Sequence, residues 1–228
     1  VTHDKNGKPQ YERSAFLRNS RDFGVPQNRP RVYIVAFSRA YFGQHISILP
    51  KEAPCKRSRT PVFENLKDVL DEKVDPRFFL SSGYLETLEK HIVTQHDKGY
   101  GFGYCIVNAP EIKNPIANTL LATGGSGRER NLIYDPINGA SCAGTSVKGK
   151  YSLINDKYIR TMTPNEWGRL QGFIGYAFVD ENGADQFSFP EGIPNVQKFK
   201  QFGNSVTIPV IEAVSYTHLR AHETRGNL

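Results

Sequence analysis

The chain has 228 residues, enough to bury one substantial hydrophobic core or two small ones. Hydrophobic residues make up 38% of it, and no apolar run approaches the ~20 residues of a membrane span, so we expect a globular protein without a membrane partner. A formal charge of +6 and an isoelectric point near 9.2 favour a polyanionic partner. The three cysteines are too scattered for a disulfide framework or a zinc site, which predicts no metal and a reducing, cytoplasmic setting.

The first residue is Val1 rather than methionine, and the segment that follows has no signal-peptide character. We therefore expect a truncated chain. At the other end, residues 215–228 abandon the apolar pattern that precedes them, and we interpret them as a non-native tail.

A polar loop, Asp22–Arg31, leads directly into the apolar run Val32–Phe37. Such a β-branched and aromatic run is typical of a strand buried on both faces. Gln27, Arg29 and Arg31 occupy alternate positions, and in extended chain alternate side chains point to one side. The pattern predicts a polar site at a sheet edge; the alternative is a solvated basic turn in which Arg31 caps the strand.

The middle of the chain alternates irregular and helical patterns. Residues 45–62 are rich in Pro, Lys, Arg and Ser and resemble a linker, after which apolar spacing predicts a short helix over Pro61–Leu70. A longer helix is predicted over Ser82–His96. The glycine–aromatic alternation of Lys98–Tyr104 suits bent strands that another backbone approaches closely.

Between Asn118 and Tyr134, two short strands are predicted on either side of a glycine-rich loop that ends in Arg128 and Arg130. Glycines extend the reach of the loop, and guanidinium groups contact phosphates or read guanine through two hydrogen bonds. The alternative is a flexible hairpin whose arginines are merely solvated.

The best-specified helix start lies in the segment Arg160–Phe173. Thr163 can cap the helix, Pro164 suits its first position, and Glu166 completes a capping box. Trp167 and Leu170 then face a core, and Gly172 ends the helix.

The chain is organised around the segment Gln201–Ile211. An apolar run at helical spacing stops at Gly203, where we expect the helix to end in the left-handed conformation that glycine accepts. Two small polar residues follow, and Pro209 opens a second helix. Such a break can lie against a polar ligand, although most such triplets are ordinary caps.

Taken in order, these segments resemble the C-terminal half of the 5-methylcytosine DNA methyltransferase family. The motifs are Gln27-x-Arg29-x-Arg31, Thr119-Leu120, the Arg160–Phe173 segment and Gly203-Asn204-Ser205-Val206. The resemblance implies an α/β fold: a partial S-adenosylmethionine-dependent methyltransferase (Rossmann-like) sheet with an inserted small, mostly β target recognition domain. It also implies a division of the chain into four parts. Residues 1–44 would belong to the distal part of the catalytic domain, and residues 45–175 would form the target recognition domain. Residues 176–214 would form a hinge and the return to the catalytic domain, and residues 215–228 are the tail.

The resemblance also implies site residues. Arg31 matches the arginine that hydrogen-bonds the flipped cytosine, and Gln27 and Arg29 hold that loop or meet the DNA backbone. The stretch Asn204, Ser205 and Val206 matches one side of the S-adenosylmethionine pocket. Four further positions are expected to contact double-stranded DNA, namely Thr119, Leu120, Arg128 and Arg130.

The implied function is that of a DNA (cytosine-5-)-methyltransferase, bacterial or phage-like, cytoplasmic and monomeric when complete. In the family a thiolate adds to the extruded base. The Pro-Cys-Gln nucleophile and the Glu-Asn-Val segment of the family are missing here, and Cys55 lies in the presumed linker without a paired carboxylate. We therefore expect the isolated chain to be inactive; the alternative is a non-catalytic, sequence-specific DNA-binding module.

Overall fold

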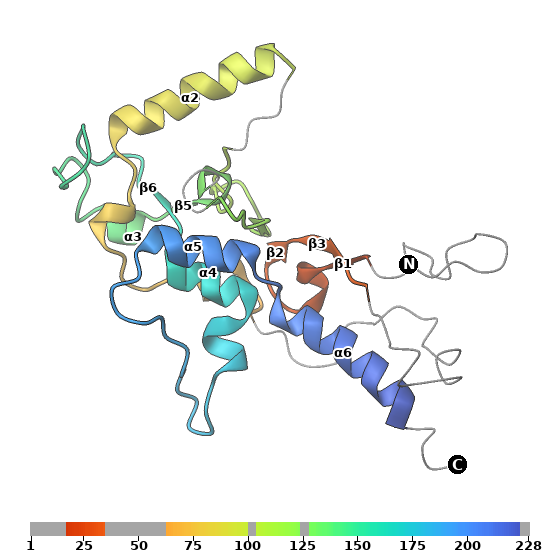
Figure 1. Ribbon diagram of the computed structural model, residues 1–228. Coiled ribbons are helices and arrows are strands. Elements are labelled where there is room, and N and C mark those ends of the chain that lie inside the picture. The colour runs from red at the N-terminus through yellow and green to blue at the C-terminus, as the bar shows by residue number, and fades with distance from the viewer. Residues whose placement is uncertain (1–16, 35–62, 100–103, 124–127, 224–228) are drawn as a thin grey trace.

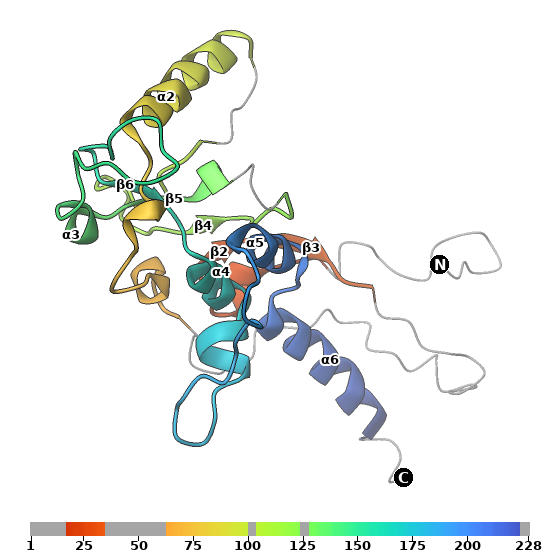
Figure 2. The ribbon, with the colours of Figure 1, turned by 60° about the vertical axis from the view of Figure 1, so that its left-hand side comes forward.

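The structure is a computed structural model, drawn in Figures 1 and 2. It describes residues 17–34, 63–99, 104–123 and 128–223, the last stretch without the side chains of residues 217–223. Several segments singled out in the sequence lie outside these residues. They are the end of the predicted strand after Ile34, the linker with Cys55, Tyr100–Gly103, and the glycine-rich residues 124–127.

The first described segment folds as a small antiparallel ribbon. Strand β1, Leu17–Asn19, pairs with β3, Pro30–Val32, and the 3₁₀ turn η2, Ser20–Phe23, lies between them. Helix α6, Ile208–Glu223, covers one face, where Tyr33 packs with Val210, Ala213 and Val214. α6 continues through residue 223, past the boundary expected at 214.

The expectation of a strand buried on both faces is wrong for the part that is described. Tyr33 is buried against α6, but Val32 and Ile34 on either side of it are 59% and 77% exposed. Alternate side chains of an extended chain point to opposite faces. One face of the ribbon is thus covered by α6, while no described element covers the other.

The described strands form three two-stranded sheets rather than one continuous Rossmann-like sheet. β2, Gln27–Asn28, runs parallel to β4, Ala117–Asn118, whereas β5, Leu132–Tyr134, is antiparallel to β6, Ile159–Thr161. The strands expected to flank the glycine-rich loop, β4 and β5, therefore have different partners and do not form a hairpin. The chain is mixed α/β, with short strands.

The described part of residues 45–175 is not mostly β, contrary to expectation. Its longest element is helix α2, Ser82–Asp97, which agrees with the predicted helix. Side-chain amides take the place of strand pairing in much of the irregular backbone. Asn155, for example, donates to the carbonyls of Leu80 and Ile159 and accepts from the amide of Ile159.

Shorter helical turns complete this region. The helix predicted over Pro61–Leu70 is confirmed only as the 3₁₀ turn η4, Leu66–Val69. The turn η5, Pro76–Phe78, and helix α3, Pro136–Gly139, are each capped by an aspartate and opened by a proline, as is common in first turns.

Helix α4, Pro164–Gln171, begins and ends as the sequence predicts. Thr163 caps it, Glu166 closes the capping box, and Gly172 adopts φ 78° at its end. α4 packs against α5, Asn195–Asn204, and the ring centroids of Trp167 and Phe199 lie 4.8 Å apart. The irregular turn η7, Phe173–Ala177, follows α4 and joins an aromatic cluster with Phe187, Phe189 and Phe202.

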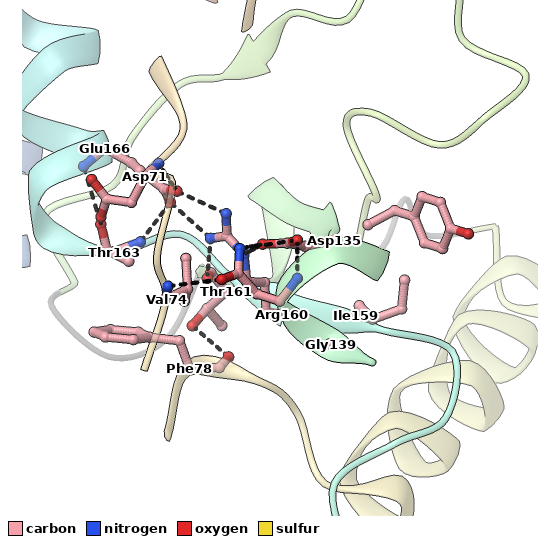
Figure 3. Close-up of polar contacts among 12 residues, drawn as sticks. Asp71, Val74, Phe78, Asp135, Gly139, Ile159, Arg160, Thr161, Thr163 and Glu166 are labelled. Atoms are coloured by element: carbon pink, nitrogen blue, oxygen red, sulfur yellow. Dashed lines mark hydrogen bonds and ion pairs between the residues drawn. The ribbon is translucent and has the colours of Figure 1, made fainter. Parts of the chain in front are cut away.

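A buried polar network fixes the start of α4 (Figure 3). Arg160 is fully buried and donates to both carboxylate oxygens of Glu166, at 2.9 and 2.8 Å, and to Asp135 at 2.7 Å. Glu166 also accepts the backbone N–H of Asp71 and of Thr163. The Arg160 guanidinium group therefore connects α4 to β6 and to the residue after β5, and Glu166 connects α4 to the segment after η4.

Charge pairing sets the ionisation of this network. Burial alone would lower the pKa of Arg160, but hydrogen bonds and charges from Glu166 and Asp135 raise it instead. For Asp135, burial alone would raise the pKa. Hydrogen bonds from the Asn138 backbone amide and from Arg160 outweigh this effect, so the pKa of Asp135 lies below its usual range. Arg160 and Asp135 are thus both charged near neutral pH.

Candidate functional site

The buried guanidinium group of Arg29 joins three segments that are far apart in the sequence. It donates to the carbonyl oxygens of Leu120 at 2.7 Å, Gly203 at 3.0 Å and Ser205 at 2.8 Å. Arg29 is only 3% exposed, and within the described residues no carboxylate forms a salt bridge with it. Three main-chain carbonyl groups therefore stabilise the buried positive charge of Arg29, and the segments that carry them meet around its side chain.

Glutamine side chains extend this convergence to α4. Gln27 is fully buried, and its amide donates to the carbonyl of Leu170 at 2.8 Å. Gln171 donates to the carbonyl of Phe202 at 3.1 Å and accepts the hydroxyl of Thr207 at 2.8 Å. All four sequence motifs are thereby joined by side-chain hydrogen bonds to main chain. We call this arrangement the Arg29 junction: Gln27, Arg29, Leu120, Gln171 and the Gly203–Ser205 carbonyls.

Burial perturbs the charge at the centre of the junction. Loss of solvation, with a smaller contribution from the charge of Arg31, lowers the pKa of Arg29 to about 10. Arg29 remains protonated at neutral pH, so its three hydrogen bonds are charge-assisted. The same charge coupling shows that the two guanidinium groups lie close enough to repel each other.

Arg31 differs from the two residues before it in the motif. Its side chain is exposed, and within the described residues it donates a hydrogen bond only to the carbonyl of Pro30, at 2.7 Å. Gln27 and Arg29, in contrast, direct their polar groups into the interior. The expectation that all three residues share one polar surface is therefore wrong. Arg31 is the member that a ligand can reach.

The segment after Gly203 offers two accessible side chains and one that is used internally. Asn204 and Val206 are exposed. The Ser205 hydroxyl donates to the carbonyl of Phe202 at 2.7 Å, and the Ser205 carbonyl accepts from Arg29. A polar ligand at this turn would meet Asn204 and Val206, while Ser205 holds the turn in place.

Gly203 is required for a reason that the sequence did not reveal. The helix α5 continues to Asn204, and Gly203 does not adopt the left-handed conformation expected of it. A Cβ atom at Gly203 would instead overlap the carbonyl oxygen of Leu121 and lie 2.7 Å from the amide nitrogen of Ala122. The absence of a side chain lets the backbone of Leu121 and Ala122 approach α5 closely.

The substitution Gly203→Ala is expected to lower the free energy of unfolding by about 1–3 kcal/mol, because backbone atoms must shift to accommodate the methyl group. Gly83→Ala in α2 is the matched control, since its new methyl group meets only the movable Ser152 hydroxyl, at 3.1 Å. Chemical denaturation of both variants measures the difference. Equal stabilities would show that the close approach at Gly203 has no energetic weight.

The residues expected to contact DNA divide into two groups. Leu120 is in the hydrophobic core and only 1% exposed, so its side chain packs inside rather than reaching DNA. Thr119 is partly exposed and donates its hydroxyl to the carbonyl of Asn28 at 2.8 Å. Both therefore contribute to the junction. Leu120 does so by packing in the core, and Thr119 by its hydrogen bond to the carbonyl of Asn28.

The two arginines after the glycine-rich segment lie in the 3₁₀ turn η6, Arg128–Asn131. Arg130 is exposed, and the Arg128 guanidinium lies over the ring of Phe199, 5.3 Å from its centroid. The stacking places Arg128 beside α5 rather than free in solvent.

Sequence reasoning missed Arg160 and Thr207. Arg160 was only part of a motif, yet it is the fully buried centre of the network in Figure 3. Thr207 bridges Gln171 and the Ser20 hydroxyl, at 2.8 Å from each. Their signal, a polar residue beside apolar neighbours, is too common to identify its partners.

The described part of the chain holds no cluster of three or more His, Cys, Asp or Glu residues suited to a metal ion. None of its helices is both long and apolar enough to cross a membrane.

Comparison with known proteins identifies the family. Residues 4–220 match the family described as C-5 cytosine-specific DNA methylase. The chain is 37% identical to the type II methyltransferase M.HpaII of Haemophilus parainfluenzae over 211 residues, which cover 92% of this chain and 50% of the relative. It is 28% identical to M1.ScrFI of Lactococcus lactis subsp. cremoris over 215 residues, 93% of this chain and 44% of the relative. The chain thus spans about half the length of these relatives.

Solved structures give weaker matches. A methyltransferase of Entamoeba histolytica, EhMeth, superposes with a TM-score of 0.47 at 15% identity, covering 90% of this chain and 52% of the other. A DNMT2 mutant of Spodoptera frugiperda gives 0.48 at 16% identity, with 90% and 56% covered. It is the sequence match over residues 4–220 that assigns the chain: it belongs to the C-5 cytosine-specific DNA methylase family.

Proposed function

We propose that this chain forms the distal part of a DNA (cytosine-5-)-methyltransferase that transfers a methyl group from S-adenosylmethionine to C5 of cytosine in double-stranded DNA. The Arg29 junction carries the proposal. It links the exposed Arg31 and the exposed Asn204 to one hydrogen-bonded unit, because Arg29 lies two residues from the first and binds the carbonyls on either side of the second. The family is one of S-adenosylmethionine-dependent methyltransferases.

In this proposal Arg31 hydrogen-bonds the edge of the extruded cytosine and orients it. A guanidinium group offers two parallel donors, which suits a base edge with adjacent acceptors. Arg29 and Gln27 act as positioning residues, since their polar groups are engaged inside the protein. Extrusion costs unstacking energy, which hydrogen bonds in the pocket offset.

The Asn204–Val206 turn fits one wall of a cofactor site. The Asn204 side chain is exposed and can donate and accept hydrogen bonds with a ligand. Val206 is 42% exposed and offers an apolar contact. Ser205 would hold this wall through Arg29 and Phe202 rather than contact the ligand. When bound, S-adenosylmethionine supplies an electrophilic methyl group; the residues of this turn would only bind and orient it.

We assign DNA contact to the recognition region and retain the domain division 1–44, 45–175, 176–214 and 215–228 as a proposal. Arg128 and Arg130 would meet the phosphate backbone or guanine edges. The open face of the β1–β3 ribbon is the surface we assign to the rest of the catalytic domain. It presents Leu17, Val32 and Ile34, and the relatives are about twice as long as this chain.

A chimera tests the proposal. This chain replaces the matching segment of the H. parainfluenzae relative, and transfer of radiolabelled methyl groups from S-adenosylmethionine to duplex DNA is measured. Arg31→Ala in the chimera is expected to lower kcat/KM by about 100-fold or more, as expected for losing one positioned donor. The exposed Arg21→Ala is the control and keeps full activity. Normal transfer by the Arg31→Ala chimera would remove Arg31 from the site.

The second candidate is a DNA-binding module without chemistry. It is favoured by one observation: burial raises the pKa of the Cys142 thiol, which disfavours the thiolate that a nucleophile needs. Duplex binding by the chain alone, lost when Arg128 and Arg130 become alanine, together with an inactive chimera, would support this candidate.

A further inference from the structure

A tight turn between α3 and β6 presents the most exposed aromatic side chain of the described residues. Tyr151 has a relative exposure of 108%, and Leu153 two residues later is 51% exposed. Lys148 is exposed beside them. A large aromatic ring that is fully in water adds nothing to core packing, and its whole face is open to a partner.

The turn has a regular, hydrogen-bonded backbone. The amide of Lys150 donates to the carbonyl of Val147 at 3.1 Å, and Gly149 has φ 88° at the third position of the turn. This combination is typical of a type II turn. The chain around the turn is closed by a further hydrogen bond, from the amide of Ile154 to the carbonyl of Thr145 at 2.9 Å.

Helix α2 anchors the residues that flank Tyr151. The amide of Gly83 donates to the Ser152 hydroxyl at 2.9 Å, and the amide of Ser82 donates to the carbonyl of Leu153 at 2.8 Å. Figures 1 and 2 both show the segment between α3 and β6 beside the start of α2. The ring of Tyr151 therefore projects from a fixed base.

Positive charge gathers at the same turn. Lys150 is partly buried, and its pKa is lowered first by loss of solvation and then by the charge of Arg128. Arg128 itself lies over Phe199 at the end of the glycine-rich segment. The charge of Arg128, an arginine that the sequence already indicated for DNA contact, therefore acts on Lys150, although the two are about twenty residues apart in the chain.

We propose that the turn Lys148–Leu153 is a DNA-contacting element in which the Tyr151 ring lies against bases while Lys148 and Lys150 contact phosphates. The inference rests on the proposed function, because it takes duplex DNA as the partner. Aromatic faces stack on any base, apolar side chains enter between base steps of a duplex that is being opened, and adjacent cations neutralise the backbone. A surface for a protein partner would have no need of the flanking lysines.

Fluorescence anisotropy with a fluorescein-labelled mixed-sequence duplex, at several salt concentrations, tests the inference on the chain itself. Tyr151→Ala is expected to raise Kd about tenfold at every salt concentration, while Tyr151→Phe keeps the ring and binds as wild type. Lys150→Ala is expected to reduce the slope of log K against log salt by about 1, a change that loss of the ring does not produce.

Val93→Ala, which removes an exposed apolar side chain from α2, is the matched control and leaves binding unchanged. Thermal unfolding midpoints confirm that the variants fold, since the Tyr151 ring lies outside the core. If Tyr151→Ala binds the duplex with wild-type affinity at all salt concentrations while Arg128→Ala binds more weakly, the role of the turn is overturned and the proposed function is not. Failure of the wild-type chain to bind the duplex would overturn it together with the DNA substrate of the proposed function.

Discussion

Glu166→Ala is expected to lower the free energy of unfolding by about 3–5 kcal/mol, the cost typical of removing one partner from a buried ion pair. Glu166 is fully buried and accepts two hydrogen bonds from Arg160, at 2.9 and 2.8 Å. The substitution leaves Arg160 with Asp135 alone, and strips the amides of Asp71 and Thr163 of their acceptor. Urea denaturation followed by circular dichroism measures the loss.

The exposed pair Lys157–Glu89 provides the control, because its 2.7 Å contact has the same charges but lies in solvent. Lys157→Ala is expected to change stability by about 1 kcal/mol at most. A loss of similar size in Glu166→Ala would mean that the buried network contributes no more than a surface pair, contrary to the structure in Figure 3.

Arg29→Met is expected to lower the free energy of unfolding by about 3 kcal/mol, because two buried carbonyl oxygens and one partly buried one lose their donor while the apolar stem is retained. The effect reaches beyond stability. Arg29 joins the backbone of Leu120 to that of Gly203 and Ser205. The substitution is therefore also expected to weaken duplex binding by the isolated chain, although Arg29 itself is buried. Denaturation and anisotropy on the same preparation measure both effects.

Arg21→Met is the matched control: the same substitution at an exposed arginine of the same segment, with an expected change within about 0.5 kcal/mol. Arg29→Lys separates charge from geometry, because an ammonium group keeps the charge but lacks the planar fork that reaches several carbonyls. If Arg29→Met were as stable as the Arg21→Met control, the junction would be incidental packing rather than the centre of the fold.

Elements with local signals could be predicted from the sequence. Helix α4 was specified at both ends by Thr163, Pro164, Glu166 and Gly172, and each takes its predicted position. Helix α2 followed from its apolar spacing. These signals act within one or two turns of chain, so no knowledge of distant partners is needed.

What the sequence could not show depends on contacts between distant segments. Gly203 was expected to be left-handed, but its role is to let the backbone of Leu121 approach. β4 and β5 were expected on either side of one loop, and their pairing with strands elsewhere in the chain had no local signal. The motif order correctly indicated the family, although it could not distinguish the buried Arg29 from the exposed Arg31, because residue type alone does not report burial.

The central claim is that Arg31 and the Asn204–Val206 turn form one site that modifies cytosine at C5. Nucleoside mass spectrometry of duplex DNA treated with the chimera and S-adenosylmethionine tests it most directly. We expect 5-methylcytosine as the product, and almost none when Arg31 is replaced by alanine. A folded chimera that binds duplex DNA yet forms no 5-methylcytosine, or one that methylates only amino groups of bases, would contradict it.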